Sequence, residues 1–319
     1  MTDQPASPTP PSNAHTIIAA ETYRKSRGRW RLAAMLALAV VVVVALGRLA
    51  LPGGGGAYVA RVVLDGAITS DRARLERLAR LAEDDKVKAV IVAINSPGGT
   101  TAGGEELYEA LTHLRAAKPT VAVIAELGAS AAYMSAIATD RVFARRLSIV
   151  GSIGVLYQHV NAGKLLDTIG VDLDKVASGP LKAEPDVNEP LEGAPRASIA
   201  VLVDDSFQWF VDIVAERRGL TRAATLALAD GRIVTGRVGV GSGLIDAIGG
   251  EAEALDWLEA ERQLPKDLTV QTVWPPEKSG FDLVGMLLGG QAGAVLGWPK
   301  GPITLDGLIS LWQVGTRAQ

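Results

Sequence analysis

A serine and a lysine in two short segments of this chain could together perform covalent chemistry. Ser130 lies in the small-residue run Gly128-Ala129-Ser130-Ala131-Ala132, where a hydroxyl can project from the start of a helix. Lys182 follows Ser178-Gly179-Pro180-Leu181 downstream. A lysine acts as a general base only when neutral, and burial among apolar groups lowers a lysine pKa toward that state. Each residue also has an ordinary interpretation, Ser130 as a helix N-cap and Lys182 as a surface lysine.

A glycine pair upstream could bind the oxyanion of such a hydrolase. Gly98 and Gly99 follow Asn95-Ser96-Pro97, and their N–H groups have no side chain in the way. Such donors contribute about 3 to 4 kcal/mol in the transition state. A plain Pro-Gly turn is the alternative. Of the three histidines, only His159, just after Gly151-Ser152-Ile153-Gly154-Val155, could replace the lysine as base.

Other side chains compete for the same roles. Ser135, one turn after the candidate nucleophile, is expected to pack inside the protein. Lys175 and Lys164 are weaker candidates for the base. Glu184 and Asp186 would oppose a lowered lysine pKa if they lay close to the candidate base.

The order and the amino-acid sequences of these segments resemble the signal peptide peptidase SppA (protease IV) family of Ser/Lys membrane peptidases, in its short single-copy form. The resemblance runs from about Tyr58 to about Leu264 and includes the late segment Asp230-Gly231-Arg232-Ile233-Val234-Thr235-Gly236-Arg237. It implies the Clp/crotonase superfamily fold of repeated ββα units and a homo-oligomer that encloses a substrate chamber. The family usually has Gly-Gly after the nucleophile, where this chain has Ala131-Ala132, and Tyr before the lysine, where it has Leu181.

The resemblance also implies a role for each site residue. Ser130 corresponds to the nucleophile and Lys182 to the base. Gly98 and Gly99 correspond to the oxyanion hole. Ser152 corresponds to a serine that hydrogen-bonds the lysine and orients it.

Composition excludes several function classes. The 319 residues carry a formal net charge of -3, so the chain as a whole has no positive electrostatic field that would attract nucleic acid. The absence of cysteine excludes a disulfide framework, a thiol nucleophile and a cysteine-ligated metal site. No H-E-x-x-H motif or P-loop occurs, so we expect no metal and no cofactor.

The N-terminal part predicts a membrane anchor. Residues 1–31 form a tail whose basic residues precede the uncharged run that begins at Leu32. Leu32–Leu51 is about as long as the roughly 20 residues that span a bilayer, provided that Arg48 snorkels to the far interface. The basic cluster keeps the N-terminus cytoplasmic and predicts export of the rest. A cleaved signal peptide is the alternative. Residues 52–57 read as a glycine-rich tether.

Strand and helix patterns alternate through residues 58–265, which predicts an α/β peptidase domain. Val87–Ile94 is a near-continuous apolar run, as in a parallel strand covered on both faces. The other strands are expected at Val59–Leu64, Thr120–Ala125, Val142–Ala144 and Leu173–Ala177. Helices are expected around Leu75–Ala82 and at Glu105–Ala117, Ala129–Thr139 and Ala194–Arg218. Residues 266–319 carry no readable motif, and their apolar segment Phe281–Trp298 favours a peripheral or packing role.

These observations together predict a membrane-anchored serine endopeptidase that cleaves hydrophobic peptides such as remnant signal peptides outside the cytoplasm. Its expected partners are peptide substrates, the lipid bilayer through Leu32–Leu51, and further copies of itself, with no nucleic acid. Two alternatives stay open. One is an inactive membrane scaffold of the same fold, and the other is a crotonase-like acyl-transfer enzyme.

Overall fold

The structure is a computed structural model of the chain, and it describes residues 30–31, 33–39, 42, 56–276 and 308–311. The chain divides into two compact units after Gly56, and the larger unit begins at Ala57. Within the described ranges, no helix is both long enough and apolar enough to cross a bilayer. Most of the predicted anchor Leu32–Leu51, and all of Phe281–Trp298, lie outside these ranges.

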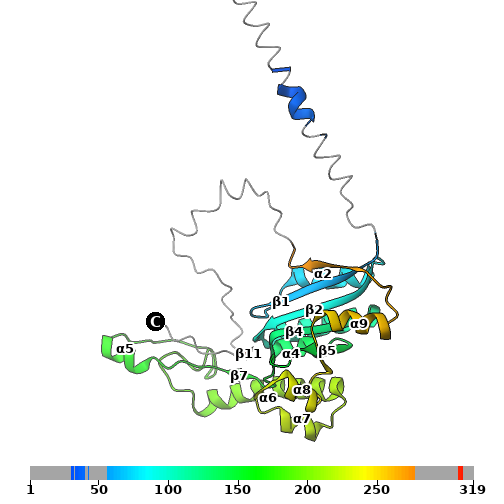
Figure 1. Cartoon of the computed structure of the whole chain (residues 1–319). Helices are drawn as coiled ribbons and strands as arrows, with labels where there is room; N and C mark the ends of the chain where they lie inside the picture. The colour runs from blue at the N-terminus through cyan, green and yellow to red at the C-terminus, as the bar shows by residue number, and fades with distance from the viewer. Residues whose placement is uncertain (1–29, 32, 40–41, 43–55, 277–307, 312–319) are drawn as a thin grey trace, which may run out of the picture. The chain divides into compact units, whose positions relative to one another are not determined.

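A mostly parallel sheet forms the centre of the larger unit (Figure 1). Its strands are β1 (Tyr58–Asp65), β2 (Val87–Ser96), β4 (Thr120–Ala129), β5 (Arg141–Ala144), β6 (Ile149–Gly151), β8 (Ile233–Thr235), β9 (Ala247–Ile248) and β10 (Thr269–Trp274). The order is β10-β1-β2-β4-β5-β9, with every neighbouring pair parallel. β6 pairs parallel with β4, and β8 pairs antiparallel with β6.

Helices cover both faces of this sheet, which confirms the expectation drawn from the apolar strands. The helices are α2 (Arg72–Glu83), α3 (Thr101–Ala117), α4 (Ala131–Ile137), α5 (Gly163–Ile169), α6 (Gly193–Arg218), α7 (Arg222–Leu228), α8 (Gly236–Gly241) and α9 (Glu251–Glu261). Val90 and Val92 of β2 belong to the core shared with α2, α3, α4 and α6. Ile91, on the opposite face of the same strand, packs in the core that includes Leu258 of α9. The fold is therefore a mixed α/β fold.

Three details differ from the sequence-based expectations. Helix α3 begins at Thr101, four residues before Glu105, because the side chain of Thr100 caps it by accepting the N–H of Gly103 at 3.1 Å. Helix α4 is shorter than predicted at both ends. The strand predicted at Leu173–Ala177 is wrong: these residues are irregular and exposed, and no described strand pairs with their backbone.

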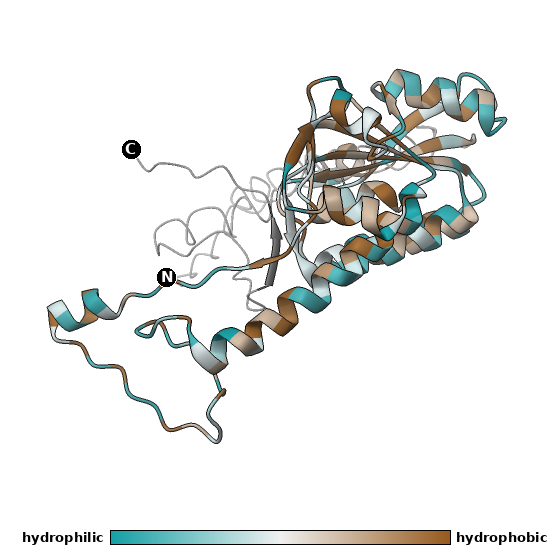
Figure 2. Ribbon diagram, turned by 90° about the horizontal axis from the view of Figure 1, so that it is seen from below, coloured by the Kyte–Doolittle hydropathy of each residue, from teal (hydrophilic) through white to brown (hydrophobic). Residues whose placement is uncertain are grey.

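Two further features lie outside the main sheet and matter for the site. A second, three-stranded sheet joins β3 (Gly98–Thr100), β11 (Leu308–Leu311) and β7 (Leu156–Tyr157) in the order β3-β11-β7. Residues 158–192, which we call the arm, contain α5 and lead into α6. Figure 2 shows the arm extending from the sheet and returning along the long helix α6, with hydrophobic residues scattered over both. The predicted domain end at residue 265 is followed by β10, which extends the main sheet beside β1.

Candidate active site

Ser130 occupies the turn between β4 and α4 in a conformation that amino acids with a side chain rarely adopt. Its φ is 59° and its ψ is -123°, whereas most non-glycine residues have negative φ. Such a backbone costs roughly 1 to 3 kcal/mol and persists only where the surroundings enforce it. The residue is also only 1% exposed. A strained, buried serine at a strand-to-helix turn is a typical setting for a nucleophile.

Hydrogen bonds on both sides of Ser130 enforce this conformation. Its N–H donates to the carbonyl of Gly151 at 2.9 Å, and its own carbonyl accepts the N–H groups of Tyr133 at 2.8 Å and Met134 at 3.0 Å. The buried phenol of Tyr133 donates to the carbonyl of Leu244 at 2.7 Å, and burial raises the pKa of this phenol well above its ordinary value. Tyr133 thereby fixes the first turn of α4 against a distant loop.

Ser152 lies beside Ser130 because their strands are paired. Ala129 of β4 is in register with Gly151 of β6, and the two serines follow these partners. Ser152 also has a positive φ of 52°, and its N–H donates to the carbonyl of Arg232 at 2.8 Å. The late motif Asp230–Arg237, which includes β8, thus supports the loop that carries Ser152.

The two glycines of β3 present their backbones differently. The N–H of Gly98, whose φ is 105°, donates to the Oγ of Ser96 at 3.1 Å. The N–H of Ile68 donates to the carbonyl of Gly98 at 2.8 Å, and the N–H of Thr100 donates to the carbonyl of Ile68 at 2.9 Å. Gly99 lies between these two bonds, so its own N–H and C=O face the opposite side. A Cβ at Gly99 would lie 1.6 Å from the Ile68 carbonyl oxygen, so this position requires glycine.

Within one chain, no hydrogen bond joins the described side chain of Lys182 to Ser130 or Ser152. Lys182 is exposed on the arm, and the described residues show no hydrogen bond or ion pair of its side chain. The nearby acids are engaged elsewhere, since the ammonium of Lys175 lies 2.6 Å from a carboxylate oxygen of Glu184 and 2.6 Å from one of Asp186. Hydrogen bonds to Asp186 and Glu184 raise the pKa of Lys175, which makes it a poor base.

The competing residues have other surroundings. The hydroxyl of Ser135 is buried and donates to the carbonyl of Ala131 at 3.0 Å within α4. The Nε2 of His159 lies 2.8 Å from the carbonyl oxygen of Glu189 on the arm. Lys164 is exposed on α5.

A cavity of about 280 Å³ opens beside the nucleophile turn. The first turn of α3, directly after β3, forms one wall, and Trp209 of α6 forms another. Met134, one turn after Ser130 on α4, also lines it. The cavity therefore lies between the first turn of α3, α4 and α6.

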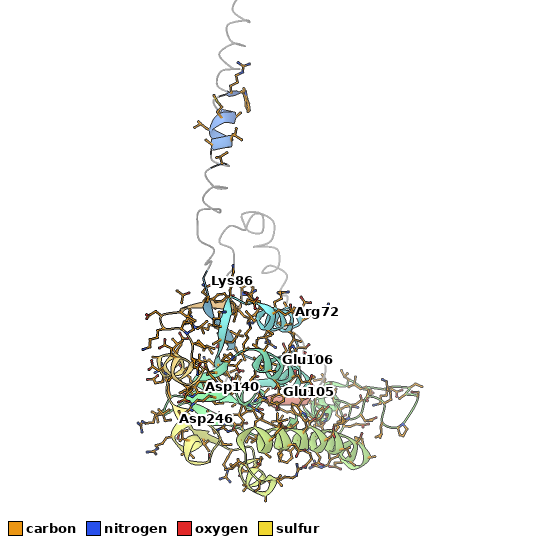
Figure 3. All side chains as sticks on the ribbon, turned by 90° about the vertical axis from the view of Figure 1, so that its right-hand side faces the viewer. Arg72, Lys86, Glu105, Glu106, Asp140 and Asp246 are labelled. Carbon is orange, nitrogen blue, oxygen red and sulfur yellow. The ribbon has the colours of Figure 1, made fainter. Side chains whose placement is uncertain are left out.

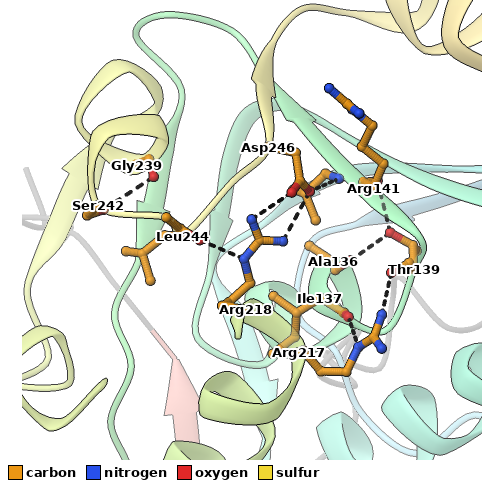
Figure 4. Close-up of polar contacts among 12 residues, drawn as sticks. Ala136, Ile137, Thr139, Arg141, Arg217, Arg218, Gly239, Ser242, Leu244 and Asp246 are labelled. Atoms are coloured by element: carbon orange, nitrogen blue, oxygen red, sulfur yellow. Dashed lines mark hydrogen bonds and ion pairs between the residues drawn. The ribbon is translucent and has the colours of Figure 1, made fainter. Parts of the chain in front are cut away.

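Two arginines at the end of α6 hold neighbouring segments, Arg217 the far end of α4 and Arg218 the loop before β9, and the sequence-based reasoning missed both (Figure 4). Arg217 donates to the carbonyls of Ile137 at 2.7 Å and Thr139 at 2.8 Å. Arg218 donates to the carbonyl of Gly243 at 2.7 Å and pairs with Asp246. The only sequence signal was a pair of basic residues in the last turn of an amphipathic helix, where they also satisfy the helix dipole.

Comparisons with known proteins agree with this geometry. The profile of the Clp protease family matches residues 58–160, and that of peptidase family S49 matches residues 112–265. A protein of Synechocystis sp. that carries the provisional name of protease is 32% identical over 236 residues, which are 73% of this chain and 84% of that protein.

Two longer relatives have more specific names. The chloroplastic serine protease SPPA of Arabidopsis thaliana is 29% identical over 74% of this chain, and protease 4 of Haemophilus influenzae is 28% identical over 66%. The matches cover only 34% and 35% of those two proteins. The strained serine turn, the glycine strand beside it and the two family matches place the chain in peptidase family S49, the family of SppA and protease 4.

Proposed function

We propose that this S49 serine peptidase is a membrane-anchored endopeptidase that cleaves hydrophobic peptides, including remnant signal peptides, with Ser130 as nucleophile and Lys182 as base. The observation that carries the proposal is the positive φ of the buried Ser130, because backbone strain of this kind persists at sites where function requires it. The names of the relatives support peptides as substrates.

The proposed chemistry uses the geometry around Ser130. Its hydroxyl attacks the peptide carbonyl while its proton passes to the neutral amine of Lys182. The N–H of Gly99 faces the groove beside β3 and stabilises the oxyanion, whereas the N–H of Gly98 is already given to Ser96. The lysine then protonates the leaving amine, and water hydrolyses the acyl-enzyme by the same route. Ser152 orients the lysine from the neighbouring strand.

We further propose that the two halves of the dyad come from neighbouring copies of the chain. Ser130 is buried in the core of one copy, whereas Lys182 is exposed on the arm. The arm and the first half of α6 also expose many large apolar side chains, which a second copy would cover. These include Val160, Leu165, Ile169, Leu173, Val176, Leu181, Val187, Val201 and Leu202.

Mixing two inactive variants tests the shared dyad. Ser130→Ala and Lys182→Ala should each abolish peptide cleavage and remain folded. Random co-assembly of the two should restore about a quarter of wild-type activity, because about one site in four then combines an intact serine with an intact lysine from its neighbour. His159→Ala is the matched control and should keep its activity. No recovery, with an active wild type, would place the dyad within one copy.

Labelling separates the peptidase from the alternatives. A fluorophosphonate should label wild-type protein at Ser130 and leave Ser130→Ala unlabelled. An inactive scaffold or an acyl-transfer enzyme without an activated serine would give no labelling in either protein.

The anchor is part of the same proposal and rests on the basic residues before Leu32–Leu51. An alkaline phosphatase reporter fused after Gly56 should be active, and one fused after Arg29 inactive. The reverse pattern would refute export of the peptidase domain.

A further inference from the structure

The loop before α2 carries the residue that orients Gly99. Ile68, in this loop, donates its N–H to the carbonyl of Gly98 at 2.8 Å and accepts the N–H of Thr100 at 2.9 Å. These two bonds leave the N–H of Gly99, the proposed oxyanion donor, on the opposite side of β3. A donor stabilises the transition state only when it points at the position of the oxyanion. The position of this loop therefore matters for catalysis.

Arg74, in the first turn of α2, reaches back to this loop. The side chain of Asp71 caps α2 by accepting the N–H of Arg74 at 3.1 Å, so Arg74 is the third residue of the helix. Side chains of a helix tilt toward its N-terminus, and the Nη2 of Arg74 donates to the carbonyl of Thr69 at 2.6 Å. The carbonyl that Arg74 holds is the next one along the chain after that of Ile68.

The surroundings of Arg74 are unfavourable for a cation. The residue is only 9% exposed, and its buried Nε has no acceptor among the described residues. Burial lowers the pKa of its guanidinium below the ordinary value, and the charges of Asp71 and Glu106 only partly offset this effect. A cation in the first turn also opposes the helix dipole. Because a buried apolar side chain of similar size would avoid these costs, stability alone does not explain an arginine here.

Helix α3 restrains the same loop by close packing. The Oγ of Ser70 donates to the Oε2 of Glu106 at 2.7 Å, and Figure 3 shows Glu106 near the start of α3. A Cβ at Gly103 would lie 2.6 Å from the carbonyl carbon of Thr69, so the backbone of the loop lies directly against this helix. The loop is thus held by α3 through packing and by α2 through the guanidinium of Arg74.

We propose that Arg74 is a positioning residue for the oxyanion hole: it holds the carbonyl of Thr69 and thereby fixes Ile68, which directs the N–H of Gly99. This inference rests on the proposed peptidase function. A displaced donor leaves the binding of the ground-state peptide nearly unchanged but stabilises the transition state less. Loss of the guanidinium should therefore lower kcat and leave KM nearly unchanged.

Arg74→Met tests the proposal, because methionine fills a similar apolar space and donates no hydrogen bond. For a short fluorogenic peptide, kcat should fall at least about tenfold with little change in KM. Arg74→Lys keeps a cationic donor and should recover part of the loss. Arg72→Met is the matched control and should behave as wild type, since Arg72 lies on the same helix, is 92% exposed in its side chain and pairs with Glu76 (Figure 3).

Three kinetic results would overturn the proposal. They are an unchanged kcat in Arg74→Met, a loss that lies in KM alone, and an Arg74→Lys variant that is no better than Arg74→Met. Should Arg74→Met fail to fold, Arg74→Lys carries the test and must have a kcat below that of Arg72→Met.

Amide hydrogen exchange gives a readout that needs no activity. The N–H groups of Ile68 and Thr100 should exchange at least about tenfold faster in Arg74→Met than in Arg72→Met, because the loop opens more readily without the guanidinium. Equal exchange would exclude the positioning role even if kcat falls. Wild-type protein that neither cleaves peptides nor reacts with a fluorophosphonate would overturn the peptidase function and the catalytic role together, whereas faster exchange would still establish that Arg74 holds the loop.

Discussion

Glycine at position 130 should be tolerated far better than glycine at the next residue, because Ser130 has φ 59° and ψ -123°. Compared with alanine at the same position, glycine releases strain of roughly 2 kcal/mol. It loses one buried carbon, about 0.8 kcal/mol, and gains unfolded-state entropy worth about 0.7 kcal/mol. The net expectation is that Ser130→Gly unfolds with a free energy about 0.5 kcal/mol above that of Ser130→Ala.

Ala131→Gly is the matched control, since Ala131 is fully buried and lies in the helix with no positive φ. Only the two losses apply there, so its free energy of unfolding should fall by about 1.5 kcal/mol. Urea unfolding, followed by circular dichroism, measures the free energy of unfolding of all three variants and the wild type. The four curves are fitted with a common dependence of this free energy on urea concentration. Should glycine at position 130 also cost about 1.5 kcal/mol relative to alanine, the backbone of Ser130 stores no strain and the reasoning fails.

Three further changes probe the supports of the site and the pH dependence of stability. Gly99→Ala should disrupt β3 and abolish cleavage, because the new Cβ would lie 1.6 Å from the Ile68 carbonyl oxygen. Gly241→Ala is the control and should keep wild-type activity, because no atom lies within 4 Å of its new Cβ; equal activity of the two variants would refute the close approach at Gly99. Tyr133→Phe should lower the free energy of unfolding by about 1 to 3 kcal/mol in urea, because it leaves a buried carbonyl without its donor, and no loss would contradict this bond. The N–H of Gly250 donates to the carboxylate of Glu253 and holds the pKa of this carboxyl below its ordinary value of 4.5. The hydrogen bond therefore stabilises the fold fully above pH 4.5, and this stabilisation is lost as the pH falls through the lower pKa of the folded state. Glu253→Gln should therefore flatten the acid limb of the stability profile, and an unchanged limb would exclude this contribution.

Local sequence was sufficient where burial alone decides the structure. The run Val87–Ile94 is apolar at nearly every position, and a strand covered on both faces places most of these side chains in a core. Leu173–Ala177 has apolar residues at both ends of a charged pair, Asp174 and Lys175, and it forms no strand, because a strand needs a partner and pairing is decided by distant parts of the chain.

The candidate site was predictable in its residue types but not in its geometry. The sequence identifies two adjacent glycines, yet only the bonds of Ile68 to Gly98 and Thr100 determine that Gly99 turns its N–H toward the groove. The strain at Ser130 is likewise invisible in the sequence, since it depends on the carbonyl of Gly151 in another strand. The exposure of Lys182 follows from the course of the arm, which no local pattern specified.

Helix α6 is held at its C-terminal end, so a change in its orientation would act like the turning of a rod about that end, the pivot. It has 26 residues and is therefore about 39 Å long. Phe210 and Val214 are buried, and Arg217 fixes the pivot through two carbonyls, whereas Val201 is 68% exposed on the free half. Over a free length of roughly 22 Å, each degree of rotation at the pivot displaces the tip, and the arm that carries Lys182, by roughly 0.4 Å. In an assembly joined through the arms, the angle between neighbouring copies would depend on how α6 is held at its C-terminal end rather than on the contacting surfaces. The number of copies that close a ring would then depend on the same contacts.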